Sequence, residues 1–350
     1  MTTLSAVRYL IEVDAERCTG CGLCAAFCPV EVFALDITAL GAAPQGAPPT
    51  IVAAEACWGC ETCAGQCPTG ALRVIAGGAG APAGAAGGAP AGASDHGAMQ
   101  QDKAAPLPAD RVALFADWAT TLKDVLQLRW EPVAISLIPV GEALPDVPVP
   151  DERLRYCQSL MAARRGVSLM MPAARHACPD GTSILGLTEM PPKLASGELY
   201  LLFRKLHSIE AARRMVHERP CLPPRSIEAT VVTPLAQAAC EPHVVAVFVQ
   251  PEQAMWLLMS SSYYTGHRHD LHASGYNAQC VETTLLPYQS GKINVSFGCY
   301  GCRAASDIGD DLMFVGIPTA LMPEVVRGLV ELGSKAIPQS RAKIYLPPMR

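Results

Sequence analysis

Blocks of basic residues are missing from this sequence of 350 residues, and its formal net charge is only -5. Nucleic-acid-binding proteins carry a basic patch as their electrostatic footprint, so we expect no nucleic-acid partner. The pairs Arg164-Arg165 and Arg213-Arg214 are too short to form such a patch. Both pairs occur in predicted helices, and we expect their side chains to lie on solvated faces.

Long apolar runs and nucleotide-binding loops are also missing. No stretch approaches the roughly 18 continuous apolar residues of a membrane span, and residues 244–249 are apolar but far too short. Residues 1–11 lack the charged segment, apolar run and cleavage site of a secretory signal. No G-x-G-x-x-G pattern or phosphate-binding loop suggests a nicotinamide or nucleoside triphosphate ligand. We expect a soluble, cytoplasmic protein with no membrane span.

Cysteine, in contrast, is abundant, and eight of the 15 cysteines follow one pattern. Two runs each read C-x2-C-x2-C-x3-C-P without a missing position. They comprise Cys18, Cys21, Cys24 and Cys28 before Pro29, and Cys57, Cys60, Cys63 and Cys67 before Pro68. Three thiolates at such intervals in a tight loop can point at one face of a cubic iron–sulfur cluster. Zinc prefers two C-x2-C knuckles separated by a longer gap, which two complete four-cysteine runs do not fit.

The two runs resemble those of bacterial two-cluster ferredoxins, and the resemblance covers residues 1–75. In that family the fourth cysteine of each run ligates the cluster of the other run. The resemblance therefore implies two 4Fe-4S clusters, one on Cys18, Cys21, Cys24 and Cys67 and one on Cys57, Cys60, Cys63 and Cys28. The odd remainder of seven cysteines argues against a disulfide framework and favours a reducing compartment, with little oxygen.

Two short strands are predicted to close this module. Residues 9–14 and 71–75 carry β-formers and can pair. The gap at residues 29–56 contains a Gly/Pro-rich loop insertion.

In this module, acidic residues outnumber basic ones, which suits docking of a basic redox partner protein. The acids are Glu12, Asp14, Glu16, Glu31, Asp36, Glu55 and Glu61.

The composition predicts three parts: a ferredoxin domain at 1–75, a flexible linker at 76–110 and a second domain at 111–350. Residues 76–93 contain only Ala, Gly and Pro, which cannot bury apolar surface. As a flexible chain the linker spans roughly 30–35 Å r.m.s.. It either holds the ferredoxin near its partner or serves as a passive spacer.

The second domain mixes helix and strand patterns, which indicates an α/β or α+β domain of mixed sheet order. The chain as a whole is assigned to the α+β class. The strands are predicted at residues 132–138, 168–171, 230–232, 244–249, 292–297 and 312–315. The helices are predicted at 112–128, 153–165, 209–218, 251–260, 275–286 and 323–332.

The stretch Ser296-Phe297-Gly298-Cys299-Tyr300-Gly301-Cys302-Arg303 is the most distinctive part of this domain. Asp310-Asp311 and Gly316-Ile317-Pro318 follow it, and Cys157 and the turn Cys178-Pro179-Asp180-Gly181 precede it. Together these residues resemble an uncharacterised family, domain of unknown function 169, over residues 115–340. The resemblance implies a shared fold but no activity, and members of the family are sometimes joined to ferredoxin modules.

The cysteines of the second domain allow three interpretations. Cys299 and Cys302 form a C-x2-C pair, and with Cys157 and Cys178 they would make a four-cysteine set for a third cluster or a zinc ion. Alternatively, the pair is a redox-active dithiol. The third interpretation is that all four are small buried residues. Cys221, Cys240 and Cys280 stand alone and are predicted to be packing residues.

Residues 263–272 are rich in polar aromatic side chains. His267, His269 and His272 could line a substrate pocket, donate protons or bind a metal. On a strand, His267 and His269 would share one face, whereas a surface loop is the simpler alternative. Arg303 could meet an anionic substrate or hold Asp310 or Asp311. The catalytic candidates are Cys299, Cys302, Arg303, His267 and His269.

Three functions fit these patterns. The chain is an electron-transfer protein that passes low-potential electrons to its own second domain or to a partner reductase. Alternatively, the second domain is itself a reductase of a small substrate, which uses Cys299 and Cys302 or a third cluster. In the third alternative it is a non-catalytic docking or assembly module. The sequence leaves open whether the chain is an enzyme, and it sets no direction of electron flow.

Overall fold

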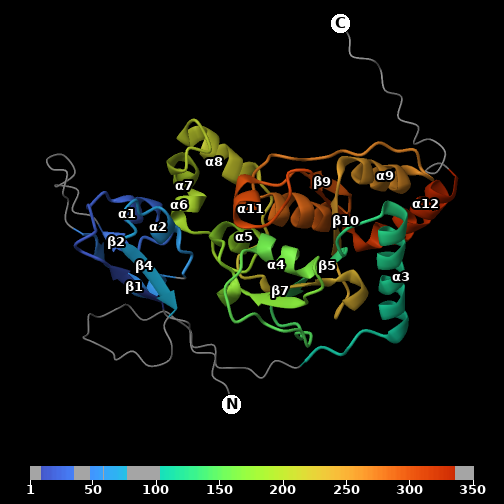
Figure 1. Cartoon of the computed structure of the whole chain (residues 1–350), viewed down its shortest axis with the longest axis horizontal. Helices are drawn as coiled ribbons and strands as arrows, with labels where there is room; N and C mark the ends of the chain where they lie inside the picture. Colours follow the sequence, from blue (N-terminus) through green and yellow to red (C-terminus); the bar gives the residue numbers. More distant parts are fainter. Residues whose placement is uncertain (1–8, 35–47, 58, 77–102, 336–350) are drawn as a thin grey trace, which may run out of the picture. The chain divides into compact units, whose positions relative to one another are not determined.

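The computed structural model describes residues 9–34, 48–57, 59–76 and 103–335 (Figure 1). The chain divides into two compact units. Residues 1–102 and 173–225 form unit 1, and residues 103–172 and 226–350 form unit 2. None of the helices in the described ranges is long and apolar enough to cross a membrane. Most of the predicted linker at 76–110 lies outside these ranges, but helix α3 already begins at Ala109.

The ferredoxin part of unit 1 is closed by the two predicted strands. Strand β1 (Tyr9–Val13) pairs antiparallel with β4 (Leu72–Ala76), as predicted. Strands β2 (Phe33–Ala34) and β3 (Thr50–Ile51) form a second small pair. Between them lie the short helices α1 (Leu23–Phe27), η2 (Ala54–Ala56) and α2 (Thr62–Gly65). Ile11, Val32, Phe33 and Leu72 pack with cysteine side chains to form its small core.

The other part of unit 1 is helical and interrupts the predicted second domain. It contains η3 (Ala173–Arg175), α5 (Pro179–Ile184), α6 (Pro192–Ala195), α7 (Glu198–Leu202) and α8 (Ile209–Glu218). The prediction for residues 209–218 is confirmed, and Ser208 caps α8 by accepting from the backbone N–H of Ala211. Helices α6 and α7 were not predicted, because each is only about one turn long and lacks a readable period.

Unit 2 is built on one six-stranded sheet with the order β6-β7-β5-β8-β10-β9. All its neighbouring strands are antiparallel, so the mixed sheet order expected from the sequence is replaced by a purely antiparallel one. Each predicted strand is present. The strands are β5 (Val133–Pro139), β6 (Leu169–Pro172), β7 (Ile227–Pro234), β8 (Val244–Val249), β9 (Asn294–Ser296) and β10 (Met313–Pro318).

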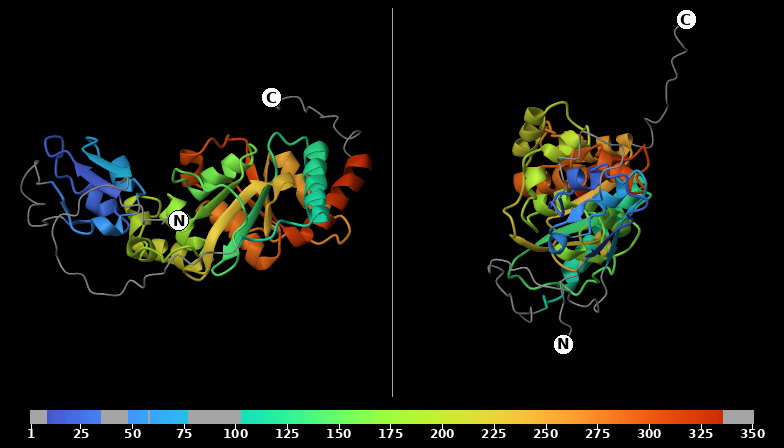
Figure 2. Two further views of the ribbon diagram at one scale, coloured as in Figure 1. Left: turned by 90° about the horizontal axis from the view of Figure 1, so that it is seen from below. Right: turned by 90° about the vertical axis from the view of Figure 1, so that its left-hand side faces the viewer.

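Helices cover both faces of this sheet. On one face, Val245, Val247 and Val249 of β8 pack against α3 (Ala109–Leu126), α9 (Pro251–Ser262) and α12 (Met322–Lys335). The red α12 lies beside the teal α3 (Figure 2). The other face is covered by α4 (Tyr156–Ala163) and by a π-helix, η5 (Ala278–Leu285). Because both faces are covered, every residue of β8 is buried.

The π-helix passes directly over strand β10. A Cβ atom added to Gly316 would overlap the carbonyl oxygen of Thr283, so a glycine is required at this crossing. Helix α10 (Leu286–Ser290) continues from η5, and the two together replace the single helix predicted at residues 275–286.

One of the two arginine pairs is not solvated as predicted: Arg164 is only 1% exposed and stacks on Trp130. The pair Arg213-Arg214 is exposed, as predicted.

Candidate functional site

The two cysteine runs fold into copies of one backbone pattern. In each, the glycine before the second cysteine adopts positive φ: Gly20 at 65° and Gly59 at 70°. The residue after the second cysteine, Gly22 or Glu61, is also left-handed and caps the short helix that carries the third cysteine. The fourth cysteine then follows the end of that helix. This repeat turns the thiols of each loop inward without long elements, which explains how so short a segment positions eight of them.

Cys28 lies among the thiols of the other run. One enclosed hollow is lined by Cys28 together with Cys57, Cys60 and Cys63. Apolar side chains, among them Ile11, complete its wall. This is the crossed ligand set that the resemblance to ferredoxins implies. On the other side, Cys18 and Cys21 approach Cys24, while Cys67 accepts a hydrogen bond from the backbone N–H of Ala71 at 3.2 Å.

The chemistry of this donor set fits an iron–sulfur cluster. Burial raises the pKa of Cys63 to about 12, and it also raises the pKa values of Cys24 and Cys28. Buried thiols packed against one another become thiolates only if nearby positive charge compensates them, and bound iron supplies that charge. The backbone N–H of Val32 donates to the Cys28 sulfur at 3.3 Å, the type of contact that stabilises a ligating thiolate.

Unit 2 contains a second group of thiols. Cys299 is the N-cap of α11 (Tyr300–Ala305), directly after β9. Its sulfur accepts from the N–H of Cys302 at 3.3 Å, and the Cys302 sulfur accepts from the N–H of Cys299 at 3.0 Å. Cys302 is only 2% exposed, whereas Cys299 is partly exposed. A hydrogen bond with the Cys299 side chain that favours the protonated thiol, burial and the neighbouring Cys157 on α4 all raise the pKa of Cys302.

Gly298 makes this arrangement possible. Its φ is 84°, in the left-handed region, so the chain turns sharply between β9 and α11. A Cβ atom there would lie 3.1 Å from the Phe314 ring and 3.4 Å from the Cys302 sulfur. The glycine of the motif is therefore needed for both backbone conformation and space.

Comparison with known families matches two parts of the chain. A model of a 4Fe-4S dicluster domain matches residues 17–71, and the model of DUF169, described as uncharacterised ArCR, matches residues 121–328. The second match covers more than half of the chain. The chain belongs to the DUF169 family. No curated protein and no solved structure matches it. Residues 17–71 are thus an iron–sulfur ferredoxin domain, joined to a DUF169 domain whose family has no described activity.

The DUF169 match includes residues of both units. Of the four cysteines proposed for a third metal site, Cys157, Cys299 and Cys302 belong to unit 2 and Cys178 to unit 1. Among the residues described, no group of three or more His, Cys, Asp or Glu side chains surrounds a single metal ion. The third site therefore stays a prediction. Cys178 is the N-cap of α5, where its sulfur accepts from the N–H of Gly181 at 3.5 Å.

The other members of the Cys-Pro-Asp-Gly motif have a structural explanation. Asp180 forms a buried ion pair with Arg219 at 2.7 Å, and the Tyr200 hydroxyl donates to the same carboxylate. This network ties α5, α7 and the end of α8 together. Cys221 lies beside Arg219 and is half-buried, Cys240 is half-buried beside Ser136, and Cys280 is buried in the π-helix. Their interpretation as packing residues is compatible with these positions.

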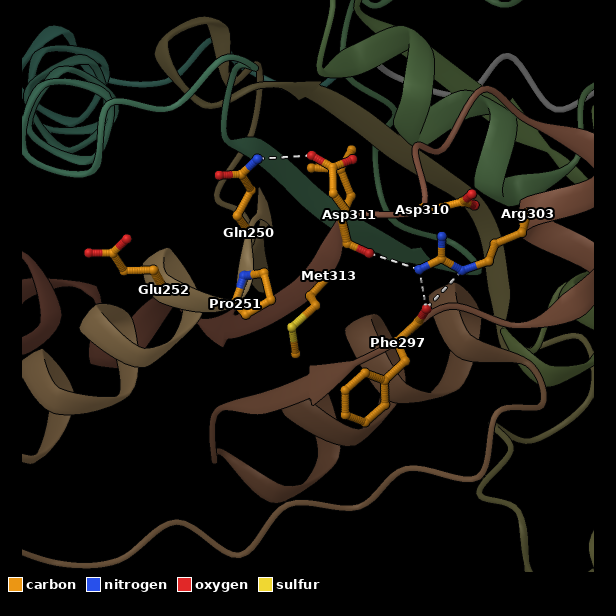
Figure 3. A pocket seen from close by; sticks show the side chains of 9 residues that line it. Gln250, Pro251, Glu252, Phe297, Arg303, Asp310, Asp311 and Met313 are labelled. Carbon is orange, nitrogen blue, oxygen red and sulfur yellow. Dashed lines mark hydrogen bonds between the residues drawn. The ribbon is translucent and has the colours of Figure 1, made fainter. Parts of the chain in front are cut away.

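Arg303, the residue after Cys302, lines an open cavity of about 470 Å³ together with Phe297 and Met313 (Figure 3). Its guanidinium donates to the backbone carbonyls of Phe297, Gly309 and Leu312, at distances from 2.6 to 3.0 Å. One predicted alternative was that Arg303 holds Asp310 or Asp311. Its guanidinium instead binds backbone carbonyls, and Asp311 accepts a hydrogen bond from Gln250 at 2.9 Å. These contacts give Arg303 a positioning role, because it clamps the backbone on both sides of α11.

The histidine stretch is a loop after α9 and not a strand. The rings of His267 and His269 nevertheless meet, with centroids 5.0 Å apart, at a cavity of about 290 Å³. His269 Nε2 lies within hydrogen-bond distance of Ser261, Ser262 and the Leu258 carbonyl, and burial lowers its pKa. His272 points to Asp270 at 3.5 Å, where both side chains are exposed. The stretch is thus a loop, and a role of its histidines in a substrate pocket, in proton transfer or in a metal site stays a prediction.

Two polar residues near the sites were not predicted. Glu282 of the π-helix is 2% exposed, and its carboxylate accepts from the N–H groups of Ser274 and Gly275 and from the Ser296 hydroxyl. It holds Ser296 at the end of β9, two residues before Gly298. In unit 1, Lys193 Nζ donates to the carbonyls of Ala25 and Ala26 on α1, at 2.7 and 3.3 Å. Neither residue belongs to a sequence motif, so no local signal identifies it.

Proposed function

We propose that this protein carries two 4Fe-4S clusters and transfers low-potential electrons between them and its DUF169 domain. The observation that supports this most directly is the position of Cys28 among Cys57, Cys60 and Cys63 in one apolar hollow. A thiol from each run at the other run's site is the ligand arrangement of two-cluster ferredoxins. Crossed ligation of this kind would bring two clusters side by side within one small core.

The residues of the chain prepare this site for electron transfer without bond making. Each bound cluster supplies one electron per redox cycle. The apolar wall of Ile11, Val32 and Phe33 excludes water, and the backbone N–H groups of Val32 and Ala71 stabilise the charge on Cys28 and Cys67. Because these wall residues are buried and packed together, the site needs little rearrangement when the charge changes.

The packing of α1 supports delivery to the DUF169 domain of the same chain. Helix α1 carries Cys24 and Cys28, and its Phe27 is only 8% exposed. Phe27 packs against α6, α7 and α8 and lies 4.8 Å from the Phe203 ring. These helices lie within residues 121–328, which match the DUF169 model. The helix that ends at a cluster ligand is thus covered by DUF169 residues, with Lys193 bound to its last carbonyls.

The test is anaerobic purification of the full chain, followed by iron analysis and EPR of the reduced protein. We expect about eight iron atoms per chain and the signals of two interacting 4Fe-4S clusters. About four would contradict the proposal, because one run would then hold no cluster. About twelve would support the alternative with a third cluster on Cys157, Cys178, Cys299 and Cys302.

A separate redox partner is the second candidate for the other end of the electron path. Six of the seven acids of the ferredoxin segment lie in the described residues, and all six are exposed; Asp36 lies outside them. An acidic face would attract a basic partner protein, and such attraction weakens with salt. If electrons pass to this partner, their transfer rate will fall several-fold between low and high ionic strength, whereas transfer within the chain will be insensitive to salt.

A further inference from the structure

We infer that Cys299 and Cys302 form a reversible dithiol–disulfide couple, a redox site of the DUF169 domain. Each sulfur accepts the backbone N–H of the other cysteine, at 3.3 and 3.0 Å, and the Cys302 thiol donates to the Cys299 carbonyl at 3.1 Å. These contacts hold the two thiols against each other across the first turn of α11. Cys299 is the N-cap of α11 with an extended backbone, so its side chain folds back over the first turn toward Cys302. A disulfide needs Cβ atoms about 3.5–4.5 Å apart, a separation set by the backbone, and rotation about χ1 then brings the two sulfurs together.

The two thiols differ in access, as the two partners of an exchange reaction should. Cys299 is partly exposed, beside the exposed side chains of Phe297 (59%) and Tyr300 (74%). Cys302 is buried beneath it, between Cys299 and Cys157. The accessible sulfur can meet a substrate, and the buried one can then attack it from within. The two exposed aromatic rings offer an apolar contact for the molecule that carries the substrate disulfide.

The reaction is a balanced thiol–disulfide exchange with a low-molecular-weight or protein disulfide. The Cys299 thiolate attacks one sulfur of that disulfide, forms a mixed disulfide and releases the first thiol. The Cys302 thiol then loses its proton and attacks the Cys299 sulfur, which forms the intramolecular bond and releases the second thiol. In total, two protein thiols and one external disulfide become one protein disulfide and two external thiols. Reduction of the protein disulfide takes up two electrons and two protons.

This stoichiometry gives the pair a place in electron transfer, and only this link rests on the proposed function. Two clusters that each carry one electron hold the two electrons that reduce one disulfide. The thiol pair would then be the two-electron site that the one-electron carriers supply. The formation of the disulfide itself depends on the local geometry alone, so it can be tested separately.

Peptide mass analysis of the full chain tests the inference directly. Trypsin cleaves after Lys292 and Arg303, and the peptide 293–303 between them contains both cysteines and no other. The intact protein is equilibrated anaerobically in buffers of reduced and oxidised dithiothreitol, and free thiols are alkylated before digestion. We expect the peptide to be doubly alkylated when reduced. When oxidised, it should be unalkylated and lighter by two hydrogen atoms, with a two-electron transition of about 30 mV per tenfold ratio.

Two cysteine variants and the alkylation pattern of peptide 293–303 define the results that would refute the dithiol–disulfide couple. Cys302→Ser should abolish the intramolecular bond, so that peptide 293–303 is singly alkylated in every buffer, whereas Cys240→Ser should change nothing. Double alkylation of peptide 293–303 at every potential, in protein whose cluster EPR signals are intact, would refute the inference and leave the proposed function standing. A crosslink from this peptide to the one that contains Cys157 would also refute it, because Cys302 would then pair with Cys157. Loss of the cluster signals with a normal thiol transition would instead count against the proposed function.

Discussion

Gly298 is the residue on which the geometry of the thiol pair depends most. Its φ of 84° strains any side-chain-bearing residue, and a Cβ atom would lie only 3.1 Å from both Phe314 and Arg303, so these neighbours would have to shift. We predict that Gly298→Ala lowers the free energy of unfolding by about 2–4 kcal/mol, from backbone strain plus steric contact. Gly291→Ala is the matched control: its φ is 65° but nothing lies within 4 Å of the added methyl group, so only about 1 kcal/mol is expected. Thermal and urea unfolding measure both, and equal losses would contradict the steric argument.

Lys193 is predicted to tune the cluster that the proposed function assigns to Cys28. Its ammonium group lies beside the last carbonyls of α1 and favours negative charge on the Cys28 sulfur. Reduction adds an electron, so removal of this positive charge should lower the potential of that cluster, by on the order of 59 mV or less. Lys193→Met should therefore shift one of the two EPR-monitored titrations to more negative potential. Lys193→Arg should retain most of the wild-type value, and Lys292→Met should shift neither titration.

Site residues that belong to a short sequence motif could be predicted, whereas those whose partners are distant in the sequence could not. The eight ferredoxin cysteines could be predicted because cluster ligation is encoded in spacing, and the crossed position of Cys28 followed from family resemblance. Lys193 could not be predicted, since its partners Ala25 and Ala26 are far away in the sequence. Glu282 stands in a predicted helix without a motif around it, and only the fold brings Ser296 to its carboxylate.

At the scale of elements, the stability that His269 contributes at the end of α9 is predicted to depend on pH. Burial lowers the pKa of His269, which is held by Ser261, Ser262 and the Leu258 carbonyl. The folded state thus favours the neutral ring, while the unfolded chain takes up a proton near pH 6.5. Stability from this site is fully present above that pH and is lost as the pH falls below it. His269→Asn should flatten the fall in unfolding free energy between pH 7.5 and 5.5. An unchanged slope in His269→Asn would contradict the assignment.

The packing of α1 on α6, α7 and α8 depends on aromatic contact. Phe203→Ala removes the ring that lies 4.8 Å from Phe27 and leaves a cavity in a small apolar cluster. We expect a loss of about 1–3 kcal/mol and faster amide hydrogen exchange in α1. Phe297→Ala, at a ring that is 59% exposed, is the control and should leave exchange in α1 unchanged. Equal exchange in both variants would show that α1 does not need this contact.

Elements with a strong period were predictable, and those shaped by tertiary contact were not. The apolar run of β8 and the capped pattern of α8 gave correct strand and helix predictions. The π-helix at Ala278–Leu285 reads as an ordinary helix in sequence, because its wider turn arises where it crosses β10 at Gly316. The antiparallel order of the sheet depends on long-range pairing, which no local pattern contains.

At the scale of the whole molecule, the compact units differ from the predicted division at residues 75 and 111. Residues 173–225 match the DUF169 model but group with the ferredoxin part in unit 1. Composition identifies the Ala/Gly/Pro stretch, but it cannot show that a helical segment inside one domain packs against another. That packing is what connects the iron–sulfur domain with the domain of unknown activity in the proposed function.

The crossed ligation of two clusters is the central claim, and one pair of variants tests it most directly. In Cys28→Ala we expect the cluster on Cys57, Cys60 and Cys63 to be lost or converted, so that iron falls from about eight toward about four atoms per chain. Cys67→Ala should instead damage the cluster on Cys18, Cys21 and Cys24, and Cys240→Ala should keep all the iron. EPR-monitored redox titration should therefore find one wild-type potential in each variant, and a different one in Cys28→Ala than in Cys67→Ala. Retention of both clusters in Cys28→Ala would contradict the account.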